Sequence, residues 1–312
     1  MSRRLRLVDP PESRRVRRAF STFLRPDAAI EPHLRAVIED VLAHPGSLAR
    51  AQLAFGLGRR LGIPTGRALR LAVATESFHA SSLIFDDLPA MDDAAERRGR
   101  PCPHRIWGEA AATLGALAFI TRGYALLWEG IGPLPPRRRD RAAALVGECL
   151  GLTGILDGQS RDVHFTHRPG GEAEMLRVEA AKTVPLIRLA LLLPALAAGL
   201  EERTLARLER LAAGWGLAYQ VLDDFKDDLL TGDEAGKTTG RDRSLGRPNL
   251  PARAGHLQAF DRLGALLAGT AAEVAALSRR SAERWEPLAR LQGVLDESRQ
   301  RLAERLAWPR TA

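Results

Sequence analysis

The feature that most constrains the fold is a succession of amphipathic helical patterns that begins at Phe20 and continues almost to the end of the 312-residue chain. Apolar residues recur at three- and four-residue spacing, which places them on one face of a helix. Ala, Leu, Arg and Glu are abundant and favour helices, whereas aromatic residues, which favour strands, make up only 5% of the chain. The sequence therefore predicts an all-α protein.

Proline and glycine divide this pattern into separate helices. Breaks are expected at residues 44–46, 62–65, 99–103, 132–136 and 167–171. None of them resembles a domain linker, and no repeat of 20 to 50 residues is evident. Residues 20–312 are therefore predicted to form a single domain, a large helical bundle. The stretch from Thr231 to Asn249, rich in Gly and charge, is longer than an ordinary loop and suggests a lid or binding loop.

The first 19 residues are strongly basic, and much of the net charge of +8 lies there. The arginines concerned are Arg3, Arg4, Arg6, Arg14, Arg15, Arg17 and Arg18. They flank a turn-prone stretch at residues 9–13, so residues 1–19 are predicted to be a disordered arm, with a phosphate or membrane-surface contact as the alternative. A nucleic-acid partner is not expected, because aromatic residues are few and no binding motif is recognised.

Location follows from the missing targeting signals. No apolar segment follows the N-terminal arginines, and no run approaches the roughly 20 apolar residues needed to span a bilayer. Cys102 and Cys149 give neither a disulfide framework nor a metal-ligand pattern. The sequence predicts a cytoplasmic protein without stable membrane insertion.

Two aspartate-rich segments, FDDLPAMDD and LDDFKDD, each follow a strongly apolar helical pattern. In the second, Asp223 and Asp227 are four residues apart and share a helix face. In the first, a straight helix would separate Asp86 from Asp92, but Pro89 permits a bulge that returns Asp92 toward Asp86. Like charges four residues apart on a helix repel by a few tenths of a kcal/mol, so the end of an apolar helix is a poor place for them unless a cation gathers them.

Magnesium suits these clusters because it prefers carboxylate oxygens and completes its shell with water and substrate phosphates. A solvated helix end would explain one acidic pair, but two such clusters are harder to explain in that way. If they face each other, they would hold several Mg²⁺ ions against one diphosphate. The metals would then neutralise the leaving group as a C–O bond breaks.

With these motifs, the sequence from about residue 30 to residue 300 resembles the trans-isoprenyl diphosphate synthases, also called polyprenyl synthetases. The first family motif, Asp-Asp-x4-Asp followed by Arg-Arg-Gly, is matched by Asp86, Asp87, Asp92, Arg97, Arg98 and Gly99. The second, Gln-x-x-Asp-Asp-x-x-Asp, is matched by Gln220, Asp223, Asp224 and Asp227. A Gly-Gln-x-x-Asp segment and a Lys-Thr pair are matched by Gly158, Gln159, Asp162, Lys182 and Thr183.

The resemblance implies a helical bundle around a central substrate cavity and a role for each matched residue. Asp86, Asp92, Asp223 and Asp227 would bind three Mg²⁺ ions, directly or through water, and Gln159 would contact substrate. Arg97, Lys182 and Lys237 would hold the allylic prenyl diphosphate, while Thr183 and Gln220 would line the carbocation. Lys237 lies in the family's flexible loop, whose closure would keep water from the cation.

The same resemblance implies a second site, for the homoallylic substrate isopentenyl diphosphate. Arg50, His79 and Arg98 match three of the four family residues there. Ser47 stands where the fourth, a lysine, belongs, and Gly46 fixes the register. The change removes one cation from a diphosphate site, where affinity depends on charge-assisted bonds. Taken alone, His79 would more often be a buried core histidine.

Product length is expected to follow from the residues upstream of the first aspartate cluster. Ser81 and Ser82 are small where short-chain members of the family often carry an aromatic ring. Phe78, about one turn deeper, is either the floor of the pocket or an ordinary core residue. The expected product is the C20 geranylgeranyl diphosphate or a C15 diphosphate, and a homodimer is implied by resemblance alone.

Two alternatives stay open. A terpene cyclase, which ionises a prenyl diphosphate without using isopentenyl diphosphate, is favoured by Ser47 but not by Arg50, His79 and Arg98. A non-catalytic partner subunit of a related synthase is the other alternative. Intact acidic clusters argue against it, because such a subunit has no evident use for their repulsion.

Overall fold

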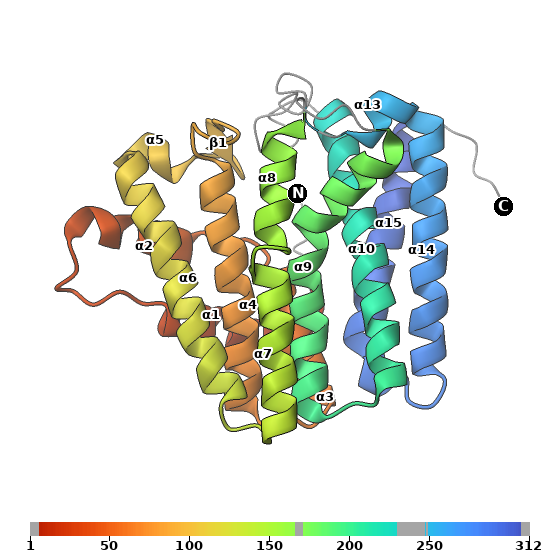
Figure 1. Ribbon diagram of the computed structural model, residues 1–312, viewed down its shortest axis with the longest axis horizontal. Coiled ribbons are helices and arrows are strands. Elements are labelled where there is room, and N and C mark those ends of the chain that lie inside the picture. The colour runs from red at the N-terminus through yellow and green to blue at the C-terminus, as the bar shows by residue number, and fades with distance from the viewer. Residues whose placement is uncertain (1–5, 166–170, 230–246, 248, 307–312) are drawn as a thin grey trace.

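Long helices packed side by side make up almost all of the described chain (Figure 1). The computed structural model describes residues 6–165, 171–229, 247 and 249–306. The first half contains α1 (Pro10–Phe23), α2 (Pro32–Ala43), α3 (Ala49–Arg60), α4 (Thr65–Asp86), β1 (Glu96–Arg97), β2 (Arg100–Pro101), α5 (Pro103–Trp107), α6 (Glu109–Ile131) and α7 (Pro136–Leu150). The second contains α8 (Ile155–Val163), α9 (Glu172–Ala198), α10 (Glu202–Leu229), α13 (Leu250–Ala254), α14 (His256–Ser278), η2 (Glu283–Trp285) and α15 (Glu286–Arg305).

The prediction of an all-α protein is confirmed, since the only strands in the described ranges are the two residues each of β1 and β2. α9 lies at the centre, in contact with α3, α4, α7, α8 and α10, while α6 packs on α4 and α14 packs on α10. One hydrophobic core runs through these layers, and Trp215, Phe55 and Phe119 are among its largest side chains. Burial of such residues is the main favourable term in folding.

Most of the expected breaks occur at the predicted places. α3 follows the break at residues 44–46, while α4 begins at the last residue of the break at 62–65 and α7 at the last residue of the break at 132–136. The break at residues 99–103 holds the β hairpin, whose two-residue turn is Arg98 and Gly99 with φ of 58° and 71°. Positive φ at both positions is typical of a type I′ turn, and glycine adopts it without strain.

The structure corrects the expectation of a disordered arm over residues 1–19. Residues 10–19 belong to α1, which buries Val16 and Phe20, and the preceding Leu7 and Val8 are also buried. The reason is an apolar stripe at helical spacing that the many arginines obscure in the sequence, together with prolines in the first turn. Residues 1–5 lie outside the described ranges.

Two helices are longer and more apolar than the sequence reading allowed. Residues 109–131 and 173–198 are each long and apolar enough to cross a membrane by length and composition alone. The second segment, part of α9, is mostly buried within the bundle. Core helices of globular proteins pass the same test, so this property of α9 is explained by its central position.

The arrangement brings the two aspartate segments to the same end of the bundle (Figure 1). α4 ends at Asp86, beside the β hairpin, and the aspartates of α10 lie in its last two turns. α8 and the start of α13 lie at this end as well. The fold therefore concentrates the predicted chemistry in one place.

Candidate functional site at the end of the bundle

The chain after α4 turns back on itself, as the proline in the first acidic motif predicts. The Asp92 amide donates to the Asp86 carbonyl at 3.0 Å, and the amides of Met91 and Asp93 both donate to the Leu88 carbonyl. Asp93 takes a positive φ of 47° at the end of this turn. The predicted return of Asp92 toward Asp86 is thus confirmed in the backbone. Burial raises the pKa of Asp86 above its ordinary value.

The neighbouring carboxylate, Asp87, has a different task. Its side chain is fully buried and accepts hydrogen bonds from Arg97 Nε at 2.8 and 2.9 Å, with Arg97 Nη2 at 2.7 Å. Paired bonds of this kind fix a guanidinium in orientation as well as position. Asp87 therefore clamps the β hairpin to the end of α4 and positions Arg97 beside the cluster.

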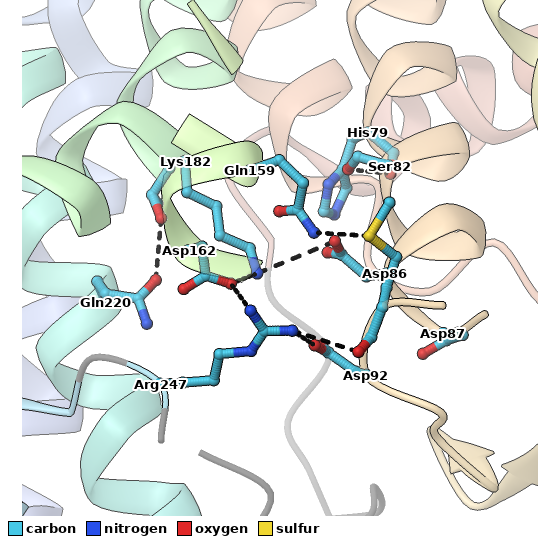
Figure 2. Close-up of polar contacts among 12 residues, drawn as sticks. His79, Ser82, Asp86, Asp87, Asp92, Gln159, Asp162, Lys182, Gln220 and Arg247 are labelled. Carbon is cyan, nitrogen blue, oxygen red and sulfur yellow. Dashed lines mark hydrogen bonds and ion pairs between the residues drawn. The ribbon is translucent and has the colours of Figure 1, made fainter. Parts of the chain in front are cut away.

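Lys182 on α9 faces the first cluster. Its Nζ lies 3.0 Å from Asp162 Oδ2 and 3.9 Å from Asp86 Oδ1 (Figure 2). Burial alone would lower the pKa of this ammonium, but the surrounding carboxylates outweigh it and raise the pKa. Gly158 makes the arrangement possible, because a Cβ there would lie 2.4 Å from the backbone of Ala181. α8 can therefore lie directly against α9 and place Gln159 and Asp162 beside Lys182.

A residue that the sequence reading missed, Arg247, lies in the middle of the site (Figure 2). Its Nη2 is 3.3 Å from Asp92 Oδ1 and 3.2 Å from the Met91 carbonyl, and its Nη1 is 3.9 Å from Asp162 Oδ2. The side chain is only 7% exposed, and within the described ranges Nε and Nη1 make no hydrogen bond. A buried guanidinium with unused donors is costly unless an acceptor completes it.

On the opposite wall, α10 presents its own polar chain. The Thr183 hydroxyl donates to Gln220 Oε1 at 2.9 Å, and Gln220 Nε2 donates to Asp224 Oδ1 at 2.8 Å. The other oxygen of Asp224 accepts the Leu250 amide at 3.0 Å. Asp224 is fully buried and ties the first turn of α13 to α10. The predicted pair Thr183 and Gln220 is therefore brought together.

The other aspartates of α10 are placed differently from Asp224. Asp223 is partly exposed, and Lys226 Nζ lies 3.6 Å from its Oδ1, while Asp227 is largely buried. These two residues, four apart, share one face of α10 as the spacing predicts. The sequence cannot distinguish the structural Asp224 from its neighbours, because all three are aspartates in one motif.

The donor set fits magnesium bound together with a phosphate ligand. Among the described residues, no three His, Cys, Asp or Glu side chains converge closely enough to make a metal site by themselves. Mg²⁺ in phosphate-transferring sites takes only one or two carboxylates and relies on water and phosphate oxygens for the rest. Asp86 and Asp92 on one wall and Asp223 and Asp227 on the other supply such carboxylates, with the cations Lys182 and Arg247 between the walls.

A second group of cations lies beside α3, α4 and the hairpin. Arg98 packs against Gly46, where a Cβ would lie 2.4 Å from its Nη1, and it donates to the His44 carbonyl at 3.5 Å. Arg50 Cζ lies 6.0 Å from the Tyr219 ring, and the described part of the chain offers its Nε no hydrogen bond. His79 is partly buried beside these arginines, and its pKa is lowered well below the ordinary value, first by desolvation and then by the charge of the arginines.

This second group is stabilised by a buried carboxylate, Glu76. Its Oε2 accepts the Ala51 amide at 2.8 Å, and its pKa is raised by burial against the opposing influence of Arg50 and Arg98. Glu76, His79 and Arg98 line a cavity of about 90 Å³ together with Phe20 of α1 and Pro45. The structure thus brings the predicted residues Arg50, His79 and Arg98 together.

Lys237 is the one predicted site residue that lies outside the described residues, as does most of the stretch from Thr231 to Asn249. The other predicted site residues form two adjacent groups of side chains, one around the aspartates and one around Arg50, His79 and Arg98. Arg247 and Asp162 join them as site residues, and the only signal for Arg247 in the sequence is its place near the end of that long charged stretch.

The contacts of Asp224 predict a stability effect that its neighbour does not share. In Asp224→Ala, the Leu250 amide and the Gln220 side chain lose buried acceptors, so the free energy of unfolding should fall by about 2–4 kcal/mol. The matched variant Asp223→Ala removes a partly exposed carboxylate that pairs with Lys226, and it should change stability by less than about 1 kcal/mol. Chemical denaturation followed by circular dichroism measures both, and equal losses would contradict the structural role of Asp224.

Comparison with known proteins places this site in a family. The polyprenyl synthetase family matches residues 31–274. The chain is 37% identical over 218 residues to the farnesyl diphosphate synthase of Escherichia coli, covering 69% of this chain and 72% of that protein. It is 32% identical over 209 residues to the geranylgeranyl diphosphate synthase of Pantoea ananas, covering 66% and 68%.

Among solved structures, the fold matches a geranyltransferase from Helicobacter pylori, crystallised with magnesium and isoprenyl diphosphate. The TM-score is 0.79 at 25% identity, and the match covers 93% of this chain and 99% of that one. The family expectation drawn from the aspartate motifs is thereby confirmed: the chain belongs to the polyprenyl synthetase family.

Proposed function

We propose that this protein is a magnesium-dependent prenyltransferase that condenses an allylic prenyl diphosphate with isopentenyl diphosphate. The observation that carries the proposal is the pairing of two sites. Two carboxylate walls with Lys182 and Arg247 between them lie next to a separate group formed by Arg50, His79 and Arg98. An enzyme that joins two diphosphates needs two such places, and the family membership agrees with this reading.

The first site suits ionisation of the allylic substrate. Asp86, Asp92, Asp223 and Asp227 would hold Mg²⁺, three ions in all, and bound magnesium would neutralise the diphosphate leaving group. Lys182 and Arg247 would exchange their carboxylate contacts for phosphate oxygens as charge develops there, with Arg97 and Lys237 as further cations. Such donors stabilise a departing pyrophosphate because they are in place before the bond breaks.

Thr183 and Gln220 would face the other product of ionisation, the allylic cation. Their hydrogen bond leaves hydroxyl and amide oxygens in a fixed orientation, and oxygen dipoles stabilise positive charge. The second group would hold isopentenyl diphosphate so that its double bond attacks the cation. A carbon–carbon bond forms, and loss of a proton then restores a double bond in a chain five carbons longer.

The length of the product is proposed to be C20, with C15 as the shorter possibility. Ser81 and Ser82 are small, and each hydroxyl donates to a carbonyl of its own helix, to Phe78 and to His79 respectively. Phe78 is buried with its ring 5.0 Å from that of Tyr124 on α6, in an edge-on contact. This pair supports a floor one turn below the serines.

Product analysis tests the proposed function. Protein and Mg²⁺ are incubated with geranyl or farnesyl diphosphate, with and without labelled isopentenyl diphosphate. Label should enter a C20 diphosphate, and a chelator should abolish the reaction because no other group replaces magnesium at the leaving group.

The second candidate, a terpene cyclase, is favoured by Ser47. Consumption of the allylic substrate to hydrocarbon or alcohol without label would establish that candidate and refute elongation.

We further propose that the protein is a cytoplasmic homodimer. The outer face of α6 exposes Leu114, Leu117 and Trp128, which lie on one side of the helix, and Ile106 on α5 is exposed nearby. Exposed large apolar side chains gathered on one face are typical of a protein–protein interface. α6 lies on the opposite side of the bundle from α14 (Figure 1).

Light scattering tests the dimer. The mass in solution should be twice the 34.0 kDa of the chain. Trp128→Glu should shift it to the monomer, because a charge would be buried at the interface. Leu257→Glu, a change at a 65% exposed residue of α14, is the matched control and should stay dimeric. A monomeric wild-type protein would contradict the proposal.

A further inference from the structure

The proposed isopentenyl diphosphate site is one cation short at Ser47, and the following inference rests on that proposed function. Ser47 brings no charge, and its carbonyl accepts the Gln52 side-chain amide at 2.6 Å. Arg50 and Arg98 remain, and the buried side chain of Glu76 lies among the same group of residues. A diphosphate carries more negative charge than this group balances, so a further cation close to Ser47 would strengthen the site.

Arg17 of α1 reaches this position from an element that the sequence reading did not assign to the site. Its Nη2 donates to the Gly46 carbonyl at 3.0 Å. That carbonyl belongs to the peptide bond that joins Gly46 to Ser47. The guanidinium is therefore held at the backbone of the position where the lysine is missing.

The rest of α1 shows that this helix forms part of the same wall. Phe20, three residues after Arg17 and thus its neighbour on the helix surface, lines the cavity that His79 and Arg98 also line. Val16 and Ala19 are buried and hold the helix in place. The position of Arg17 is thus fixed by packing, whereas the neighbouring Arg18 is exposed.

The charge around Arg17 indicates an anionic ligand. Within the described residues Arg17 forms no ion pair, and it is half-buried. A guanidinium has five N–H donors, and the Gly46 carbonyl accounts for one hydrogen bond. Arg98, which packs against Gly46 and donates to the His44 carbonyl, brings a second guanidinium to the same stretch of chain. Two guanidinium groups close to one neutral backbone segment repel each other, and an anion bound between them would compensate both charges.

We propose that Arg17 is a substrate-binding residue that supplies the missing cation for the diphosphate of isopentenyl diphosphate. The family lysine is replaced by Ser47 in the loop before α3, and Arg17 supplies its positive charge from α1. The allylic diphosphate, held by the carboxylate walls and Lys182, does not use it.

Steady-state kinetics with the full-length protein test this role. Arg17→Gln should raise KM for isopentenyl diphosphate about tenfold, the cost of one charge-assisted hydrogen bond, and leave kcat and KM for the allylic diphosphate within about twofold. Arg18→Gln, at the exposed neighbour, is the matched control and should leave all three values unchanged. Adding Ser47→Lys to Arg17→Gln should restore KM, because it returns the cation from the family position.

A purely structural Arg17 predicts a different pattern. Arg17→Gln would then lower the melting temperature and change both KM values together, and Ser47→Lys would restore neither KM value. That result would overturn the proposal. An unchanged KM for isopentenyl diphosphate in Arg17→Gln would overturn it as well. Failure of the proposed function is distinguishable, because the wild-type protein would then incorporate no isopentenyl diphosphate. That outcome would overturn both proposals.

Discussion

The main constraint on this structure is that the fold brings several mutually repelling carboxylates together, so their charge must be compensated. Asp86 ends α4 and Asp92 lies in the turn that follows it. Asp223 and Asp227 lie near the end of α10, and Asp162 lies on α8 beside the first pair. Buried like charges are tolerable only when cations compensate them. Lys182 and Arg247 do so within the protein, at the places where a metal-bound diphosphate would also bind.

Several local contacts fix the positions of these charged side chains. The turn at Pro89 returns the Asp92 amide to the Asp86 carbonyl, and Asp87 directs its carboxylate away from the cluster to clamp Arg97. Asp224 likewise faces away and anchors α13. In each aspartate pair, one residue therefore holds neighbouring structure in place, while the other is the proposed metal ligand. This division explains why adjacent residues of one motif have different burial and partners.

Local patterns in the sequence predict much of this arrangement. Helical periodicity predicts the bundle, Pro89 predicts the turn, and the family motifs predict that Thr183 and Gln220 meet. Contacts between distant segments are not encoded locally, so the sequence did not reveal Arg247 beside Asp92 or Arg17 at Gly46. The helix α1 was missed because its apolar residues are scattered among arginines, and only packing against the bundle shows which face is buried.

We propose above all that the carboxylate walls bind a magnesium-bound allylic diphosphate, whose phosphate oxygens replace the carboxylates as partners of Lys182 and Arg247. A crystal structure with Mg²⁺ and an unreactive thio analogue of the allylic diphosphate tests this most directly. Metal density is expected against Asp86, Asp92, Asp223 and Asp227, with Lys182 and Arg247 bonded to phosphate oxygens. A diphosphate bound elsewhere, with Arg247 still paired to Asp92 and Asp162, would contradict it.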